Sequence, residues 1–535
     1  MTAEPRFRVL IADKIDRKGL EPLADDARFE LVEQVGLTGE ALARAIAKAD
    51  AVLVRSATLI TRESLAEATH LKVIGRAGVG IDTIDVDAAT EKGIAVLNAP
   101  AGNTISATEL TFALVLALLR KIPLADRSMK AGKWDRSSFQ GVEIAGKTLG
   151  LVGAGRVGAE VARRARAFDM RVVAFDPFLN QERARALDLE LAPLEDVLRH
   201  ADVLSLHVPL TESTAGMIGQ AQLSLMKPGA YLVNASRGGV VDQDALIEHL
   251  ECGRLAGAAF DVYDQEPLPN DHPLRRLENV VLTPHLGAST DEAQRSVALE
   301  IATAVRLALL EGDLSRAVNA PAIGGEKMRR VRPLLDLSER LGRLARSLTD
   351  GPVDLVELRY AGVEDDILRP LAASALVGLL QTALGASEVN FVNALHLAET
   401  RDIEVDWARV KRHTAYAEFI ELLVRHKGAE TRVAGAMLGA GHPRVVRIGE
   451  FHVDIQPKGT LVVIWNRDVP GVIGRVGTLL GQAGLNIAGY HQARHDEGGQ
   501  ALAAIAIDGL LTAQLRADLA AVPEVLEVRQ VDLDR

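Results

Sequence analysis

The fold of this chain is decided by residues 148–177, which read TLGLVGAGRVGAEVARRARAFDMRVVAFDP. An apolar run leads into a G-x-G-x-x-G pattern formed by Gly153, Gly155 and Gly158, and a helical pattern and a second apolar run follow. The glycine pattern alone is weak, but a strand before it, a helix after it and an acid closing the next strand are typical of a dinucleotide-binding βαβ unit. The segment therefore predicts a parallel α/β sheet that binds a dinucleotide.

Each residue of the pattern has an expected part in holding the dinucleotide. Gly153 makes the tight turn, Gly155 lets the backbone approach the pyrophosphate, and Gly158 lets the helix pack on the strand. The helix then begins at the phosphates, where its free amides favour anions. Asp176 ends the second strand, where a carboxylate accepts hydrogen bonds from ribose hydroxyls and repels a 2′-phosphate, so NAD is favoured over NADP. A glycine-rich turn without a ligand is the simpler alternative.

The same alternation of strand-like and helical runs extends outward from this segment, from Arg6 to about Ala320. Four strand-like runs precede it (RVLIAD, AVLVRS, LKVIGRAG and IAVLNAP), and six runs begin at Gly146. Two doubly wound parallel sheets are therefore expected. Thr290 to Gly312 predicts one long helix, and Ser106 to Lys121 predicts an amphipathic one.

Two further units are expected after Gly324-Gly325. Residues 326 to about 456 alternate helical and strand-like runs and lack phosphate-loop glycines. After 457–459 the order is strand, helix, strand, strand, helix, strand, which predicts a ferredoxin-like βαββαβ unit. The fold class is therefore α/β throughout.

Composition narrows the class of protein. The 535 residues are enough for three or four domains, and 48% hydrophobic residues are ordinary for a folded soluble chain. A net charge of −11 argues against nucleic-acid and acidic-membrane partners. Cys252 is the only cysteine, so a reducing cytoplasm is expected. The longest apolar run, 112–119, is far shorter than the roughly 20 residues that a membrane span needs.

Polar side chains stand where three of the six later strand-like runs end. Arg237 follows AYLVNAS, Asp261 and Glu266 follow LAGAAF, and His285 follows NVVLTP. Ligands of open α/β sheets collect at these carboxyl ends. Each residue alone is more simply a solvated loop residue, but together they suit hydride transfer on a 2-hydroxy acid: Arg237 clamps the carboxylate, His285 takes the hydroxyl proton and Glu266 holds the imidazole. The histidines have no paired ligand spacing, so no metal is expected.

These stretches resemble the D-isomer-specific 2-hydroxyacid dehydrogenases across residues 6 to 320. Members of that family carry an Arg, Glu and His set, which falls here on Arg237, Glu266 and His285. The resemblance also implies contacts to NAD from further residues at the strand ends. The complete expected set is Gly153, Gly155, Arg156, Val157, Gly158, Asp176, Val208, Pro209, Ala235, Ser236, Arg237, Asp261, His285, Gly287 and Ala288.

The resemblance implies that the first domain is split by the insertion of the second. The expected domains are a substrate domain at 1–102 plus 290–320, an NAD-binding Rossmann domain at 103–289, an intervening domain at 321–456 and a regulatory ACT domain at 457–535.

Within the family the likeness is greatest to long members that act on D-3-phosphoglycerate. VRSATLIT, GRAGVGIDTID, NAPAGNTISATE and GKWDR carry it. By that likeness Arg55, Arg76 and Asn103 would bind the substrate. Arg136 would reach the site of a neighbouring subunit, which implies a homo-oligomer, a dimer or a tetramer. Solvated charges at strand ends are the alternative for Arg55 and Arg76.

The C-terminal third resembles regulatory units of the same long members. WNRDVPGVIGRVGTLLGQAGLNIAGY resembles an ACT domain, which implies L-serine as effector, held by Asn466, Asp468 and Asn486. An ACT fold used only for assembly is the alternative. VNFVNALHLAE resembles the intervening domain, where Arg444 and Arg447 are candidates for an anion site, or else part of a solvated basic turn.

The sequence thus predicts NAD-dependent oxidation of D-3-phosphoglycerate to 3-phosphohydroxypyruvate, the first step of L-serine synthesis, inhibited by serine. Two alternatives stay open. One is another 2-hydroxyacid dehydrogenase or reductase, acting on hydroxypyruvate or glyoxylate. The other is a non-catalytic NAD-sensing scaffold, since some corepressors resemble this fold.

Overall fold

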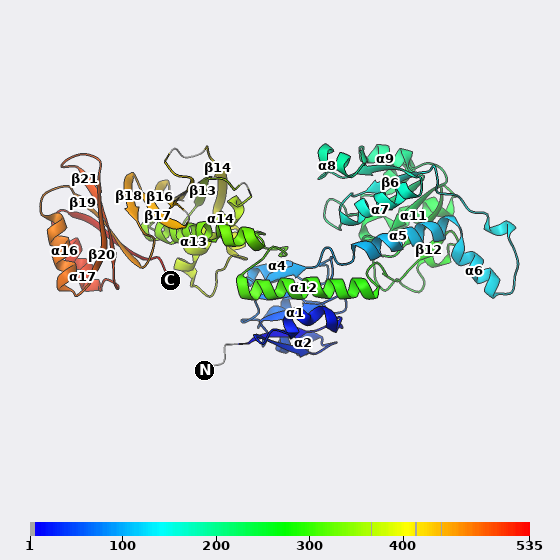
Figure 1. Ribbon diagram of the computed structural model, residues 1–535, viewed down its shortest axis with the longest axis horizontal. Helices are drawn as coiled ribbons and strands as arrows, with labels where there is room; N and C mark the ends of the chain where they lie inside the picture. The colour runs from blue at the N-terminus through cyan, green and yellow to red at the C-terminus, as the bar shows by residue number, and fades with distance from the viewer. Residues whose placement is uncertain (1–5, 365, 412–414, 440, 535) are drawn as a thin grey trace.

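The computed structural model describes residues 6–364, 366–411, 415–439 and 441–534. Four sheets follow one another in this part of the chain, and each is the centre of one unit. In Figure 1 the first unit, in blue, lies between the second unit on the right and the third and fourth units on the left. No helix of the described ranges combines the length and the apolar character that crossing a bilayer requires.

The first unit is a five-stranded parallel sheet with helices on both faces. Alternate residues of each strand point to opposite faces, so two separate apolar layers form. Its strands, in spatial order, are β2 (Phe29–Glu33), β1 (Phe7–Ile11), β3 (Ala51–Val54), β4 (Val73–Arg76) and β5 (Ala95–Asn98). Its helices are η1 (Arg17–Leu20), α1 (Glu21–Ala24), α2 (Gly39–Ile46), α3 (Arg62–Leu65), α4 (Val86–Glu91) and α12 (Asp291–Glu311).

Helix α12 follows the last strand of the second unit and covers one face of the first sheet. The prediction of a long helix between Thr290 and Gly312 is confirmed, because both residues act as caps. The Thr290 hydroxyl accepts a hydrogen bond from Ala293 N at 3.2 Å, and Gly312 ends the helix with φ 67°. Strand β2 was not predicted.

The second unit is a seven-stranded parallel sheet. Its strands, in spatial order, are β12 (Val280–Leu282), β11 (Leu255–Phe260), β10 (Ala230–Asn234), β9 (Val203–Leu206), β6 (Thr148–Val152), β7 (Arg171–Phe175) and β8 (Glu190–Leu191). The six predicted strands are confirmed, and the two-residue edge strand β8 was missed. The chain order reverses at β6, which lies between β7 and β9, and such a switch point is where these sheets bind ligands.

Helices cover both faces of this second sheet. Those of one face are α5 (Thr104–Leu119), α7 (Arg156–Ala167) and α8 (Gln181–Ala186), and those of the other are α9 (Leu194–His200), α10 (Gln220–Leu225) and α11 (Gln243–Glu251). The short 3₁₀ turns are η2 (Ser137–Phe139), η3 (Gly238–Val240) and η4 (Pro273–Arg276). Helix α6 (Ile122–Lys130) has no buried residue and projects from the unit at the right of Figure 1.

The third unit is a six-stranded mixed sheet. Its strands, in spatial order, are β14 (Glu404–Arg409), β13 (Leu355–Ala361), β15 (Glu418–His426), β16 (Ala429–Leu438), β17 (His442–Ile448) and β18 (Phe451–Ile455). Its helices are α13 (Gly325–Leu348), α14 (Leu368–Leu384) and α15 (Ala394–Glu399). The expected alternation of helix and strand is wrong after β14. Two-residue turns at Lys427-Gly428 and Gly449-Glu450 join antiparallel hairpins there instead.

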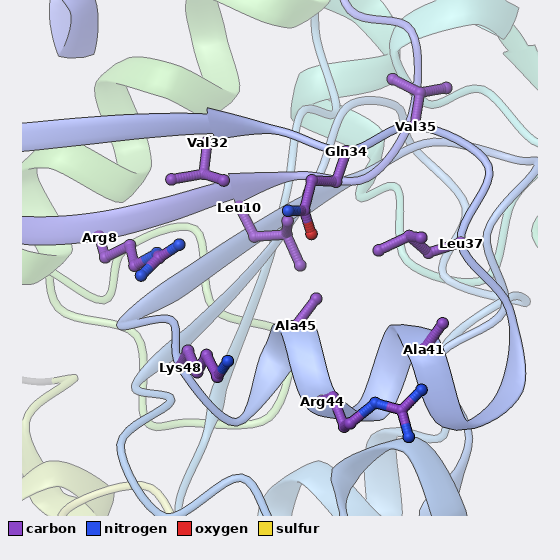
Figure 2. A pocket seen from close by; sticks show the side chains of 10 residues that line it. All are labelled: Arg8, Leu10, Val32, Gln34, Val35, Leu37, Ala41, Arg44, Ala45 and Lys48. Atoms are coloured by element: carbon purple, nitrogen blue, oxygen red, sulfur yellow. The ribbon is translucent and has the colours of Figure 1, made fainter.

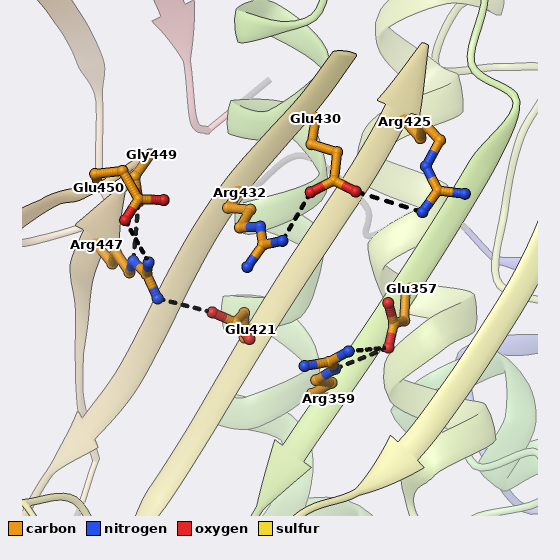
Figure 3. Close-up of polar contacts among 9 residues, drawn as sticks. All are labelled: Glu357, Arg359, Glu421, Arg425, Glu430, Arg432, Arg447, Gly449 and Glu450. Atoms are coloured by element: carbon orange, nitrogen blue, oxygen red, sulfur yellow. Dashed lines mark hydrogen bonds and ion pairs between the residues drawn. The ribbon is translucent and has the colours of Figure 1, made fainter. Parts of the chain in front are cut away.

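The outer face of this sheet carries a ladder of paired charges across neighbouring strands (Figure 3). Arg447 lies 3.1 Å from Glu421 and 3.2 Å from Glu450, and it belongs to strand β17. Arg444 of the same strand lies 2.6 Å from Asp454. Both candidates for an anion site are therefore in a strand, not in a basic turn, and both are already paired with acids.

The fourth unit confirms the predicted βαββαβ order. Its elements are β19 (Thr460–Arg467), α16 (Val472–Gln482), β20 (Ile487–Arg494), β21 (Gln500–Ile507), α17 (Ala513–Ala520) and β22 (Val525–Asp532). The strands pair antiparallel in the order β20-β21-β19-β22. One face of the sheet is covered by its own two helices, and the other shares an apolar core with the third unit.

Candidate active site

The three glycines of the 153–158 loop occupy positions that a side chain would disturb or close. Gly153 has φ 92°, and a Cβ there would come within 2.5 Å of His207 O. A Cβ at Gly158 would come within 2.1 Å of Gly153 O, because the start of α7 packs directly on the turn. A Cβ at Gly155 would meet nothing within 4 Å, so this backbone is open to a pyrophosphate. The loop therefore fits a dinucleotide.

Asp176 ends β7 beside this loop. Its carboxylate accepts hydrogen bonds from Ala154 N and Phe178 N, each at 2.9 Å. The other predicted NAD contacts also lie at the carboxyl edge of the second sheet. They are Arg156 and Val157 at the start of α7, Val208 and Pro209 after β9, Ala235 and Ser236 after β10, and Gly287 and Ala288 after β12. The structure gathers them along one edge, around the switch point at β6.

Replacing Asp176 with asparagine is expected to lower the preference for NAD over NADP by about tenfold, because one like charge facing a 2′-phosphate is removed. The measurement is the ratio of kcat/KM for the two cofactors. Asp188→Asn is the matched control, since Asp188 is an exposed acid of the same unit. An unchanged ratio in Asp176→Asn would show that Asp176 does not face the ribose.

His207 at the end of β9 makes the second unit sensitive to acid. Burial lowers the pKa of its imidazole to about 4, and its Nε2 lies 2.9 Å from Ser205 Oγ. Because the folded pKa is below the unfolded value, the unfolded chain binds more protons between pH 4 and roughly pH 6.5. Stability is therefore lost as pH falls through that window, by about 2 kcal/mol at pH 5. The midpoint of thermal unfolding should fall more between pH 7.5 and pH 5 for wild type than for His207→Gln. Equal decreases in the two proteins would contradict this role of His207.

The turn that carries His285 is wound around the buried carboxylate of Asp261. That carboxylate accepts hydrogen bonds from Leu286 N at 2.7 Å, Gly287 N at 2.9 Å and Thr283 Oγ1 at 2.7 Å. Burial raises the pKa of the Asp261 carboxyl against the opposing effect of these donors. His285 has φ 55°, a left-handed conformation uncommon for a residue with a side chain, and its N–H donates to Asp261 O at 2.9 Å. Asp261 thus fixes the direction of the imidazole.

Glu266 holds the imidazole in a defined tautomer. Its Oε2 lies 2.7 Å from His285 Nδ1, and its Oε1 accepts a hydrogen bond from Tyr263 N at 3.0 Å. A carboxylate at that distance assigns the proton to Nδ1, which leaves Nε2 free to accept one. The His285 side chain is 50% exposed and the Glu266 side chain is 36% exposed, so a substrate can reach them.

Arginines of the first and second units lie close enough to influence one another. Arg237 Nε, from the end of β10, lies 3.3 Å from Asp82 of the first unit. Burial, and then the charge of Arg237, lower the pKa of Arg76 to about 10, and Arg55 adds to the effect. Arg76 Nε is buried without a hydrogen-bond partner among the described residues. The three guanidinium groups therefore share one positive field, which favours an anion.

The glycines of GRAGVG make room for two of these arginines, a role that sequence analysis missed. A Cβ at Gly78 would come within 1.3 Å of Arg76 Nη1, and a Cβ at Gly80 within 2.1 Å of Arg237 Nη2. Both guanidinium groups thus lie against the loop after β4. The available signal was a strand end with three glycines and an arginine in six residues.

Asp13 is a second residue that sequence analysis missed. It follows β1 and accepts hydrogen bonds from Arg55 N at 2.5 Å and Thr58 Oγ1 at 2.8 Å. Burial lowers the pKa of Arg55, and the charge of Asp13 opposes that shift. Asp13 thus holds the loop that presents Arg55.

The two other predicted substrate residues, Asn103 and Arg136, lie in different parts of the chain's structure: Asn103 is next to the first unit and Arg136 is not. Asn103 caps α5 next to the first unit, and its Oδ1 is buried without a partner among the described residues. Arg136 is exposed beyond α6. Trp134 next to it is 79% exposed. Within one chain the structure does not bring Arg136 to the arginine cluster.

The predicted effector residues divide between the two ends of the fourth sheet. Asn466 and Asp468 lie where β19 ends, and Asp468 is paired with Arg494 at 2.9 Å. Asn486 precedes β20, at the end where β19 begins, and donates to Asp508 at 2.8 Å. The strand between them spans about 23 Å at 3.3 Å per residue. One chain therefore does not bring the three residues together.

Figure 2 shows a cavity of about 560 Å³ between β1, β2 and α2, and none of the predicted site residues lines it. No three His, Cys, Asp or Glu side chains of the described ranges converge as metal ligands.

Comparison with known proteins assigns these units. The NAD-binding domain of the D-isomer specific 2-hydroxyacid dehydrogenases matches residues 112–287. The D-3-phosphoglycerate dehydrogenase intervening domain matches 330–449, and the ACT domain matches 460–524. The second unit is therefore an NAD-binding domain, and the last two units are the predicted intervening and ACT domains.

The similarity extends over nearly the whole chain. D-3-phosphoglycerate dehydrogenase of Archaeoglobus fulgidus is 39% identical over 529 residues, which cover 98% of this chain and 100% of that one. The enzyme of the same name from Mycobacterium bovis is 41% identical over 98% of this chain and 99% of its own. D-lactate dehydrogenase of Aquifex aeolicus, solved with NAD and lactic acid, has a TM-score of 0.51 at 31% identity, over 58% of this chain and 98% of its own. The chain belongs to the D-isomer-specific 2-hydroxyacid dehydrogenase family, as an NAD-dependent dehydrogenase with the phosphoglycerate dehydrogenase intervening domain and an ACT domain.

Proposed function

We propose that the chain oxidises D-3-phosphoglycerate to 3-phosphohydroxypyruvate with Arg237, Glu266 and His285 as its catalytic set. The observation that carries the proposal is the meeting of Arg55, Arg76 and Arg237 in one field, at the sheet edge where the Glu266–His285 pair lies. A substrate with a carboxylate and a phosphate has the two anionic groups that such a cluster requires.

Each residue of the set has one step in the reaction. Arg237 holds the α-carboxylate through paired N–H donors and so places the hydroxyl-bearing carbon. His285 Nε2 takes the hydroxyl proton while the carbon gives up its hydride and becomes a carbonyl. Glu266 stabilises the imidazolium that results. NAD, when bound along the second sheet, supplies the hydride acceptor.

Arg55 and Arg76 are proposed to bind the phosphate, together with Asn103. The direct test compares D-3-phosphoglycerate with D-glycerate, which lacks only the phosphate. Wild type should favour the phosphorylated acid by about 10² in kcat/KM, and Arg76→Gln should lose most of that preference. A preference for D-glycerate, glyoxylate or hydroxypyruvate would favour the reductase alternative instead.

The scaffold alternative is tested by turnover itself. A scaffold would bind NAD without producing NADH from any 2-hydroxy acid, and it would recruit peptide ligands. The near-complete match to named dehydrogenases supports catalysis.

A homo-oligomer is proposed from the same geometry. Helix α6 has no buried residue, and Ile122, Met129 and Trp134 near it are exposed. A second copy covering this arm would bury apolar surface and carry Arg136 toward a neighbouring arginine cluster. Size measurement of wild type and Trp134→Asp tests it: the variant should dissociate, and an unchanged size would contradict this interface.

L-serine is proposed as the effector of the ACT domain, and an ACT fold used only for assembly stays the alternative. The match to the ACT domain supports binding of an amino acid. Asp468 and Asn486 lie at opposite ends of the fourth sheet, so a site that contains both requires two chains. Serine should lower turnover in wild type and act more weakly on Asp468→Asn.

The domain limits at 102, 289, 320 and 456 are proposed on the packing of the four sheets.

A further inference from the structure

A cavity lies where the first and third units meet. It has a volume of about 560 Å³, within the range typical of ligand sites. One wall belongs to the first unit and the linker after it, and consists of Thr90, Asn319 and Pro321. The other wall belongs to the third unit and consists of Arg369, Val392, Leu395, His396, Glu399, Ile403, Val405 and Trp407.

The two walls are held together by specific contacts, so the pocket is a built feature of the junction. Asn390 Nδ2 donates to Gly93 O at 2.9 Å, and a Cβ at Gly93 would come within 2.2 Å of that amide nitrogen. Val392 is buried in the apolar layer of the first unit. Asn319 Nδ2 donates to Thr90 Oγ1 and Ile94 O, each at 2.9 Å, and fixes the opposite wall.

The lining combines two free charges of opposite sign with an apolar floor. Arg369 and Glu399 are exposed and make no side-chain hydrogen bond or ion pair within the described ranges. Ile403, Val405 and Trp407 form the floor beside them. A free guanidinium prefers a carboxylate, a free carboxylate prefers an ammonium group, and the floor prefers an apolar chain.

We propose that this junction pocket binds an α-amino acid with an apolar side chain. Its carboxylate pairs with Arg369, its ammonium group with Glu399, and its side chain covers Trp407. Because the two walls come from different units, the ligand favours the docked arrangement of the third unit on the first. The site differs from the ACT domain in position and in preference, since the short polar side chain of serine leaves the floor uncovered. It rests on no step of the proposed reaction.

The test measures binding of L-leucine to the full chain by equilibrium dialysis, so no turnover is needed. Isocaproate lacks only the ammonium group of leucine, and isoamylamine lacks only its carboxylate. L-leucine should bind saturably, and each analogue should bind about tenfold more weakly or worse. Arg369→Gln and Glu399→Gln should each weaken leucine by a similar factor. Arg401→Gln is the matched control, because Arg401 is exposed nearby and does not line the pocket.

Three results would overturn the proposal. Leucine that fails to saturate the chain shows that the pocket does not take this ligand. Equal binding of leucine and both analogues shows that the charges do not recognise it. Unchanged leucine affinity in both variants places the ligand elsewhere, including the ACT domain. Retained NAD binding in the variants shows that they are folded.

Discussion

His285→Ala is expected to lower kcat by about 10² to 10⁴ while the Kd for NAD stays within about twofold of wild type, since the imidazole is the only proposed proton acceptor. The left-handed turn at His285 is fixed by the backbone and by Asp261, not by the imidazole, so the rest of the site keeps its shape. Stopped-flow or steady-state NADH production, with NAD binding measured in parallel, checks this.

The matched control is His200→Ala, because His200 is exposed on α9 of the same unit. Glu266→Gln provides the finer test of positioning. It keeps an acceptor for Nδ1–H but removes the charge that stabilises the imidazolium, so its rate should fall about tenfold. Full activity of His285→Ala would exclude the histidine as base.

Arg237→Gln is expected to lower kcat/KM by about 10² to 10³, because glutamine cannot supply the paired charged donors that hold a carboxylate. The loss should be equally large for D-3-phosphoglycerate and D-glycerate, since both carry the carboxylate. Arg76→Gln should instead affect the phosphorylated acid much more. This division separates the two arginines by the part of the substrate that each one binds.

Two variants control for the Arg237 result. Arg237→Lys keeps the charge but lacks the planar guanidinium group, so its kcat/KM should lie between those of wild type and Arg237→Gln. Arg276→Gln removes an exposed arginine of the same unit and should have no effect. An Arg237→Gln enzyme with wild-type KM and kcat would show that the carboxylate is held elsewhere.

The parts of the fold that sequence predicted are those with a strong local signal. The 148–177 segment has the right periodicities and glycines, and the long helix has a threonine and a glycine at its ends, so local chemistry and tertiary structure agree. Strands β2 and β8 were missed because they are edge strands, FELVE and EL, whose charged residues hide the apolar alternation.

The third unit shows a different limit of prediction from sequence. Strands β15 to β18 were expected to alternate with helices, but two-residue turns join β15 to β16 and β17 to β18 instead. In β18, for example, the buried residues Phe451, Val453 and Ile455 alternate with the exposed residues His452 and Asp454, a pattern that indicates a half-buried strand. The signal was present in the sequence and was outweighed by the helical runs before it.

The candidate site was predictable in its residues but not in its contacts. Arg237, Glu266 and His285 could be read from strand ends, because parallel strands bring their carboxyl ends to one edge. That Gly80 accommodates the guanidinium group of Arg237 depends on how the first and second units face each other. The distance between Asp468 and Asn486 follows from the strand register, which cannot be predicted from a local sequence pattern.

The central claim is tested most directly by NADH production from D-3-phosphoglycerate at alkaline pH, where loss of the hydroxyl proton is favoured. The account predicts steady NADH formation with 3-phosphohydroxypyruvate as the product, at a kcat/KM about 10² above that for D-glycerate. Binding of NAD without NADH formation from D-3-phosphoglycerate would contradict it.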